Sequence, residues 1–205
     1  TVIWQRPYAD HMRTILLGDP GQSDPPNRNS AVAMVFDISG FPERPAEMVA
    51  FHWIYGKGSY WPFIYKMEEL YDTYHPVFAG FDATGTQKAM DELVLTQRGP
   101  ARLFSGLNVA GNKHAMVLAL KVLMGKGLIQ IPKSAKSIWL QLANWHLPDK
   151  KLRQDIASCL FMVGDVINSL SAIDDEEDES EEVVDMPYDR NDLNRVMAEV
   201  TNIPM

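Results

Sequence analysis

The sequence predicts an α/β protein with a mixed sheet, on three observations. Apolar runs bounded by turn residues predict strands at residues 15–17, 31–38 and 47–55. Short gaps separate these strands, which favours antiparallel pairing among them. Two further predicted strands, at residues 77–82 and 101–108, alternate with segments of helical spacing, as parallel strands with crossover helices do. We therefore expect a mixed five-stranded sheet, three antiparallel strands followed by parallel crossovers, flanked by helices.

Helical periodicity follows in the order that this topology requires. Before the fourth strand, Phe63, Met67 and Leu70 recur on one helical face. Gly125 and Gly127 end a later apolar helix. The helices expected from such patterns span residues 61–74, 86–94, 112–124, 134–145 and 152–167.

Charge is distributed unevenly along the 205 residues. The net charge is −8, yet residues 174–185 alone hold nine acids and no base, and the remainder is nearly neutral. Such a run is typical of a solvated tail, although it could also dock a basic partner. We expect a linker or N-terminal extension over residues 1–13, a folded domain over residues 14–172 and an acidic tail over residues 173–205, in which residues 191–200 could form a short helix.

The composition excludes several classes of protein. A single cysteine, Cys159, excludes an intramolecular disulfide and a cysteine-rich zinc site, and its place on an apolar helix face indicates core packing. The longest apolar stretches fall short of the roughly 20 residues that a membrane span needs, so no membrane partner is expected. The sequence also lacks the phosphate-binding motif G-x-x-x-x-G-K-[S/T].

Two predicted strands each end in an aspartate followed by a glycine-containing turn. These residues are Asp19, before Pro-Gly, and Asp82, before Ala-Thr-Gly. Ligands of open α/β sheets gather at the carboxyl ends of the strands, and paired carboxylates suit Mg²⁺ or Mn²⁺. Asp155 lies beside the apolar face of the last helix and could complete the site. Asp19 and Asp82, each taken separately, are equally well explained as turn residues, but the combination of the three acids predicts a metal centre.

Five segments in a fixed order carry a resemblance to a known family. They are Leu16-Leu-Gly-Asp19-Pro-Gly with Ser30-Ala-Val, Ala79-Gly-Phe-Asp82-Ala-Thr-Gly, Gly111-Asn-Lys113, Gly127-Leu-Ile-Gln-Ile-Pro132 and Gln154-Asp155-Ile-Ala-Ser-Cys-Leu. Over roughly residues 14–170 the chain resembles the C-terminal nuclease domain of tailed-bacteriophage large terminase subunits, which has the RNase H-like fold.

The resemblance implies a metal-dependent endonuclease that cuts concatemeric viral DNA during genome packaging with little sequence preference. It identifies Asp19, Asp82 and Asp155 as the catalytic, metal-binding acids, with Mg²⁺ or Mn²⁺ as the cofactor. Asp149 is the alternative residue for the third ligand position. Two metal ions at such a site activate water and stabilise the leaving oxygen of a phosphodiester.

The same resemblance suggests partners and a location. Double-stranded DNA would be held without sequence readout by basic residues, namely Lys113, Arg28, Lys133, Lys136, Lys150, Lys151 and Arg153. The ATPase domain and small subunit of the terminase, and the portal or procapsid, are the protein partners implied, in the cytoplasm of the infected bacterial host. Two alternatives stay open: a junction resolvase-like nuclease, and a non-catalytic domain that docks on a portal, capsid or motor component.

Overall fold

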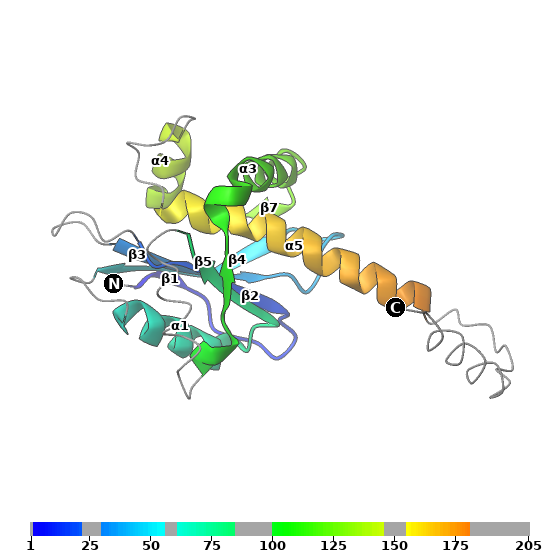
Figure 1. The fold of residues 1–205 in the computed structure, drawn as a ribbon, viewed down its shortest axis with the longest axis horizontal. Helices are drawn as coiled ribbons and strands as arrows, with labels where there is room; N and C mark the ends of the chain where they lie inside the picture. The colour runs from blue at the N-terminus through cyan, green and yellow to red at the C-terminus, as the bar shows by residue number, and fades with distance from the viewer. Residues whose placement is uncertain (1, 22–29, 56–60, 85–99, 146–154, 181–205) are drawn as a thin grey trace, which may run out of the picture. The chain divides into compact units, whose positions relative to one another are not determined.

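A seven-stranded mixed sheet forms the centre of the computed structural model, which describes residues 2–21, 30–55, 61–84, 100–145 and 155–180 (Figure 1). The strands are β1 (Val2–Gln5), β2 (Thr14–Asp19), β3 (Ser30–Asp37), β4 (Ala46–Tyr55), β5 (Phe78–Asp82), β6 (Ser105–Leu107) and β7 (Ile129–Gln130). The helices are α1 (Trp61–Tyr74), the 3₁₀ turn η2 (Pro100–Leu103), α3 (Val109–Gly125), α4 (Lys136–Asn144) and α5 (Asp155–Ser180).

The strand directions confirm the predicted mixed α/β sheet. The sheet order is β1-β4-β3-β2-β5-β6, with β7 paired to β4. Strands β2, β3 and β4 pair antiparallel, whereas β2, β5 and β6 run parallel. The prediction of five strands was too low, because the short strands β1 and β7 both pair with β4.

Helices cover both faces of the sheet (Figure 1). Helix α1 lies on one face, and α3, α4 and α5 lie on the other. Successive residues of β2 contact opposite layers. Leu16 belongs to the core cluster that includes Phe63 and Met67 of α1. The carbonyl of the next residue, Leu17, accepts a hydrogen bond from the thiol of Cys159 in α5. Strand β2 is therefore buried from both sides, which explains its continuous apolar sequence.

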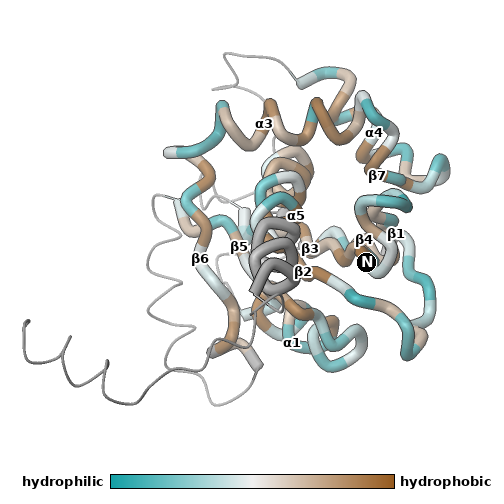
Figure 2. Tube along the Cα trace, turned by 90° about the vertical axis from the view of Figure 1, so that its right-hand side faces the viewer, coloured by the Kyte–Doolittle hydropathy of each residue, from teal (hydrophilic) through white to brown (hydrophobic). Residues whose placement is uncertain are grey.

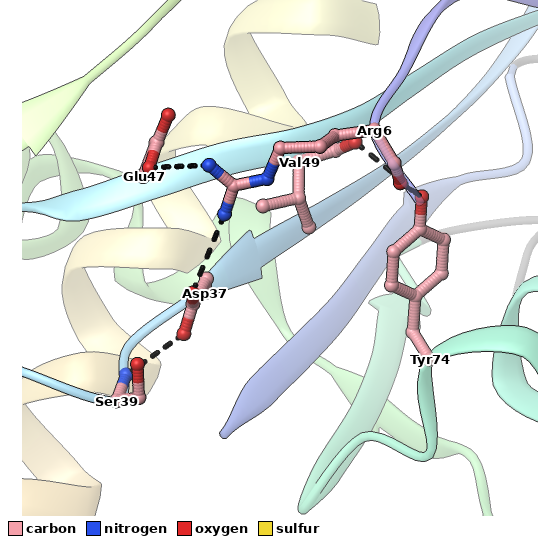
Figure 3. A network of polar contacts seen from close by, with 6 residues as sticks. All are labelled: Arg6, Asp37, Ser39, Glu47, Val49 and Tyr74. Atoms are coloured by element: carbon pink, nitrogen blue, oxygen red, sulfur yellow. Dashed lines mark hydrogen bonds and ion pairs between the residues drawn. The ribbon is translucent and has the colours of Figure 1, made fainter. Parts of the chain in front are cut away.

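Residues 1–13, expected as a linker or extension, contribute an edge strand to the sheet. Arg6, directly after β1, pairs with Glu47 of β4 at 2.8 Å and with Asp37 at the end of β3 at 3.5 Å (Figure 3). The hydroxyl of Tyr74 donates to the carbonyl of Arg6. These contacts fix the N-terminal segment to both the sheet and α1.

The strand expected over residues 101–108 is shorter in the structure. Only Ser105–Leu107 pair with β5, and the chain before them forms the turn η2. Ala101 and Phe104 lie three residues apart and are both buried in the core cluster beside α1, a spacing that a turn satisfies and an extended strand does not. The helix expected over residues 86–94 lies outside the described residues.

A compact unit extends over Thr1–Asn168, and a second unit begins at Ser169 within α5. The predicted acidic tail, from residue 173, therefore begins inside a helix that ends at Ser180. Residues 181–205, with the short helix expected over residues 191–200, lie outside the described part. Across the described ranges, no helix combines the length and apolar character needed to cross a bilayer.

A histidine is buried in the middle of the sheet. His52 of β4 is 1% exposed, and among the described residues its Nε2 atom has no hydrogen-bond partner. Burial, reinforced by the positive charge of Lys66, lowers the pKa of His52 to about 4. The folded protein therefore holds this imidazole neutral at pH values where an unfolded chain protonates it.

We predict that this histidine makes the fold sensitive to acid. Because the folded pKa lies below the unfolded value of about 6.5, the free energy of unfolding falls as pH drops from 6.5 toward 4, with a contribution of about 2 kcal/mol between pH 7 and pH 5. Urea unfolding at both pH values should show this loss in the wild type and its removal in His52→Phe. The exposed His114→Phe is the control, and equal pH dependence in His52→Phe and the wild type contradicts the assignment.

Candidate metal centre

The two strand-terminal aspartates stand side by side at one edge of the sheet. Strands β2 and β5 run parallel, and their register pairs Gly18 with Phe81, so that the next residues are Asp19 and Asp82. Both are buried, with 5% and 7% of their surface exposed. The sequence prediction that the carboxyl ends of these strands bring two acids together is thus matched by the register.

Each aspartate also stabilises the turn that follows it. The Oδ1 atom of Asp19 accepts the N–H of Gly21 at 2.8 Å, and the Oδ1 atom of Asp82 accepts the N–H of Thr84 at 2.9 Å. Gly21 has φ +73°, a conformation that favours glycine. The turn role considered from the sequence is therefore real, and it holds both carboxylates at fixed positions beyond the strand ends.

Helix α5 brings a third acid to this edge. A Cβ atom on Gly18 would lie 2.5 Å from the Phe63 ring in α1, so Gly18 faces α1 and the next residue, Asp19, faces α5. Asp155 is the acid in the first turn of that helix and is half-buried. Its charge raises the pKa of Asp19, as does that of Asp82. The three predicted acids are thus electrostatic neighbours.

The environment disfavours negative charge on Asp19. Burial raises the pKa of Asp19 well above its ordinary value, Asp82 and Asp155 raise it further, and hydrogen bonds from Gly21 and Ser158 oppose the shift. Burial also raises the pKa of Asp82, against hydrogen bonds from Thr84 and the charge of Lys113. A divalent cation bound between buried carboxylates would remove their mutual repulsion and stabilise their ionised form.

Lys113 is placed near the acids by the start of α3. The Oγ1 atom of Thr84 accepts the N–H of Ala110 at 3.1 Å, and the side chain of Asn108 caps the helix by accepting the N–H of Gly111 at 3.0 Å. These bonds join the β5 turn to the first turn of α3. The charge of Lys113 consequently lowers the pKa of Asp82.

Two of the other basic residues predicted to contact DNA lie at the start of α4. Lys133 precedes α4 and Lys136 is its first residue, and both are exposed. Arg28, Lys150, Lys151 and Arg153 lie outside the described residues, as does Asp149, the competitor for the third ligand position.

Two polar residues at the site were not assigned to it from the sequence. Ser158 is 4% exposed, and its hydroxyl lowers the pKa of Asp19. The backbone N–H of Thr84 donates to Asp82, while its hydroxyl oxygen accepts from Ala110 of α3. A usable signal existed for Ser158, because it follows Asp155 by three residues and so shares its helical face.

The donor chemistry fits a hard cation, since three carboxylates supply oxygen ligands of the kind that Mg²⁺ and Mn²⁺ prefer. Within the ranges that the structure describes, however, no three His, Cys, Asp or Glu side chains form a compact ligand set. Asp19, Asp82 and Asp155 are therefore neighbours rather than an assembled cluster.

A separate apolar cavity lies between α3, α4 and α5. Its volume is about 430 Å³, and its lining consists of Val117, Leu120, Lys121, Met124, Leu142, Trp145 and Phe161. Helix α3 is hydrophobic along much of its length (Figure 2), and Leu118 and Val122 on it are exposed. None of the three acids lines this cavity, so it is distinct from the candidate metal centre.

Comparison with known proteins assigns no family. No protein-family model matches the chain, and no curated protein matches it.

We predict that Asp19 lowers the stability of the metal-free protein. Its folded pKa lies above the unfolded value, so the free energy of unfolding falls as pH rises through the folded pKa. Asp19→Asn removes the charge and keeps an oxygen that can accept the Gly21 N–H. In EDTA at pH 7.5, urea unfolding should give the variant a free energy of unfolding equal to that of the wild type or up to about 2 kcal/mol higher.

The same variant should lose stabilisation by metal. Mn²⁺ should raise the melting temperature of the wild type, because an ion that binds only the folded state stabilises it, and should leave that of Asp19→Asn unchanged. Asp72→Asn, on the exposed surface of α1, is the matched control. An Asp19→Asn protein that is clearly less stable in EDTA, or that responds to Mn²⁺ like the wild type, contradicts the assignment.

Proposed function

We propose that the chain is a metal-dependent endonuclease that hydrolyses phosphodiester bonds of double-stranded viral DNA during genome packaging. The proposal rests on the grouping of Asp19, Asp82 and Asp155 around the carboxyl ends of β2 and β5. The charges of Asp82 and Asp155 both raise the pKa of Asp19, which supports this grouping. We propose the terminase class of nuclease in particular because the sequence motifs resemble those of that family.

The sheet topology supports an RNase H-like arrangement. Its central order is β4-β3-β2-β5-β6, with the first three strands antiparallel and the last two parallel to β2. This is the arrangement of three antiparallel strands and parallel crossovers that the resemblance implies. In it, the first strand of the sequence pattern, β2, lies at the centre and carries the first acid.

The carboxylates of Asp19, Asp82 and Asp155 would hold one or two Mg²⁺ or Mn²⁺ ions. When bound, such ions activate water and stabilise the leaving oxygen of the phosphodiester. Gly21 and Thr84 keep two of the carboxylates in place through backbone N–H groups. Lys113, held near Asp82 by the start of α3, would bind a phosphate oxygen of the substrate.

DNA would be held through its backbone, which suits cleavage with little sequence preference. Lys133 and Lys136 are exposed and available for such contacts, and Arg28, Lys150, Lys151 and Arg153 are proposed from the sequence alone. The same proposal includes the terminase ATPase domain, the small subunit and the portal or procapsid as protein partners. It places the protein in the cytoplasm of the infected host.

We predict that loss of either strand-terminal carboxylate abolishes cleavage. Asp82→Asn keeps the oxygen that accepts the Thr84 N–H but removes a charged ligand. The rate of Mn²⁺-supported nicking and linearisation of supercoiled plasmid, followed on agarose gels, should fall at least about 100-fold in this variant and in Asp19→Asn. The control variant Asp72→Asn should cut at the wild-type rate.

Other outcomes separate the alternatives. Undiminished cutting by Asp19→Asn or Asp82→Asn overturns the site. Much faster cleavage of branched than of linear duplex DNA favours a junction resolvase-like nuclease. Failure of the wild type to bind divalent ions in calorimetry, together with no cleavage in any metal, favours the docking domain.

A further inference from the structure

Helix α3 is more apolar than its burial explains. Lys113 and Lys121 are its only Lys, Arg, Asp or Glu residues, and apolar residues occupy most of its circumference (Figure 2). A helix that is apolar all round is normally enclosed by other parts of the protein. In this helix, however, Leu118 is 57% exposed and Val122 is 46% exposed. One face of α3 is therefore apolar and open to solvent.

The apolar cavity described above lies along the same helix. Val117, Leu120 and Met124 of α3 line it together with residues of α4 and α5. An apolar cavity of about 150 Å³ takes one benzene-sized ring. The present volume of about 430 Å³ is therefore large enough for more than one apolar side chain.

The cavity and the exposed apolar face form one continuous surface on α3. Lys121 also lines the cavity. Leu118 and Val122 each follow a cavity-lining residue by one position, so they lie about 100° further round the helix. We call the cavity, together with Leu118 and Val122, the α3 groove.

The charge around the α3 groove has one sign. Residues 100–145, which include α3 and α4, contain six Lys or Arg residues and no Asp or Glu. The acids of α5 within the first compact unit, Asp155 and Asp165, do not line the cavity. A symmetric pair of copies joined through this face would bring two Lys121 side chains into one interface, where like charges repel. The charge therefore favours an acidic occupant over a second copy of the chain.

The shape and apolar character of the groove indicate what kind of acidic molecule fits. Contacts with a DNA backbone are made by basic and polar groups, and they leave Leu118 and Val122 without a partner. A bilayer receives apolar side chains that project from a surface, and it does not fill a hollow between helices. An apolar hollow flanked by charge is the surface on which amphipathic helices dock, with residues at i, i+3, i+4 and i+7 as anchors.

We propose that the α3 groove docks an acidic amphipathic helix of a partner protein. Apolar residues of that helix fill the cavity and cover Leu118 and Val122, and its Asp or Glu residues pair with Lys121. None of Asp19, Asp82 and Asp155 lines the groove, so docking does not require the proposed nuclease activity.

The test uses the full chain and a fluorescein-labelled helical peptide of about 16 residues, or about four helical turns. The peptide carries Leu at i, i+3, i+4 and i+7 and Glu at the flanking positions, and a second peptide carries Lys in place of each Glu. Fluorescence anisotropy measures both Kd values. We expect the Glu peptide to bind at least about tenfold more tightly than the Lys peptide.

Two variants test the apolar part of the groove. Leu118→Ser combined with Val122→Ser should raise the Kd of the Glu peptide at least about tenfold, because the peptide then covers less apolar surface. Both side chains are exposed, so the fold does not depend on them. Leu103→Ser, in η2, is the matched control, because Leu103 is 54% exposed and lies outside the groove. Its Kd should stay within twofold of the wild type.

A charge reversal tests the ionic part. Lys121→Glu should weaken binding of the Glu peptide and strengthen binding of the Lys peptide. A variant that merely disturbed packing would weaken binding of both peptides, so the reversal distinguishes pairing at Lys121 from a structural defect.

The remaining outcomes overturn the proposal. These are failure of the wild type to bind the Glu peptide, equal binding of the two peptides, and equal Kd values in the groove variant and Leu103→Ser. A wild-type dimer in analytical ultracentrifugation that Leu118→Ser with Val122→Ser dissociates would assign the groove to a second copy. Binding to phosphatidylserine vesicles that the same variant abolishes would assign it to a membrane surface.

Discussion

The parallel pairing of β2 with β5 is the contact on which the candidate site depends. Its register, with Gly18 opposite Phe81, brings Asp19 and Asp82 to the same height at one edge of the sheet. Strand β2 is also paired with β3 and buried beneath helices on both faces, so its end is held firmly. A slip of one residue would turn Asp19 toward α1, where Gly18 now leaves room only for the Phe63 ring.

The site concentrates negative charge where the fold tolerates it poorly. Two buried aspartates and a half-buried third lie close enough that burial and mutual repulsion raise the pKa of Asp19. Local donors offset part of this cost: Gly21 and Ser158 at Asp19, and Thr84 with Lys113 at Asp82. Residues kept despite an energetic penalty are typical of functional sites, where a bound ion or substrate provides the missing interaction.

Sequence reasoning succeeded where the signal was local. Apolar runs ending in Asp-Pro-Gly and Asp-Ala-Thr-Gly located both strand ends, and helical periodicity located Asp155. It missed β1, whose partner strand β4 lies far along the sequence, with Val2 opposite His52. It also missed β7, which is two residues long. The effect of Ser158 on the pKa of Asp19 was missed for the same reason, because only tertiary packing decides which helix turn meets which strand end. The motif resemblance and the nuclease activity stay predictions.

The central claim is that Asp19, Asp82 and Asp155 together bind divalent cations. The most direct measurement is anomalous diffraction at the manganese edge, from crystals of the full chain grown or soaked with Mn²⁺. The account predicts one or two anomalous peaks at the carboxyl ends of β2 and β5, within coordination distance of Asp19 and Asp82 and with Asp155 directed at them. Well-ordered strand ends without a peak, or manganese bound elsewhere, would contradict it.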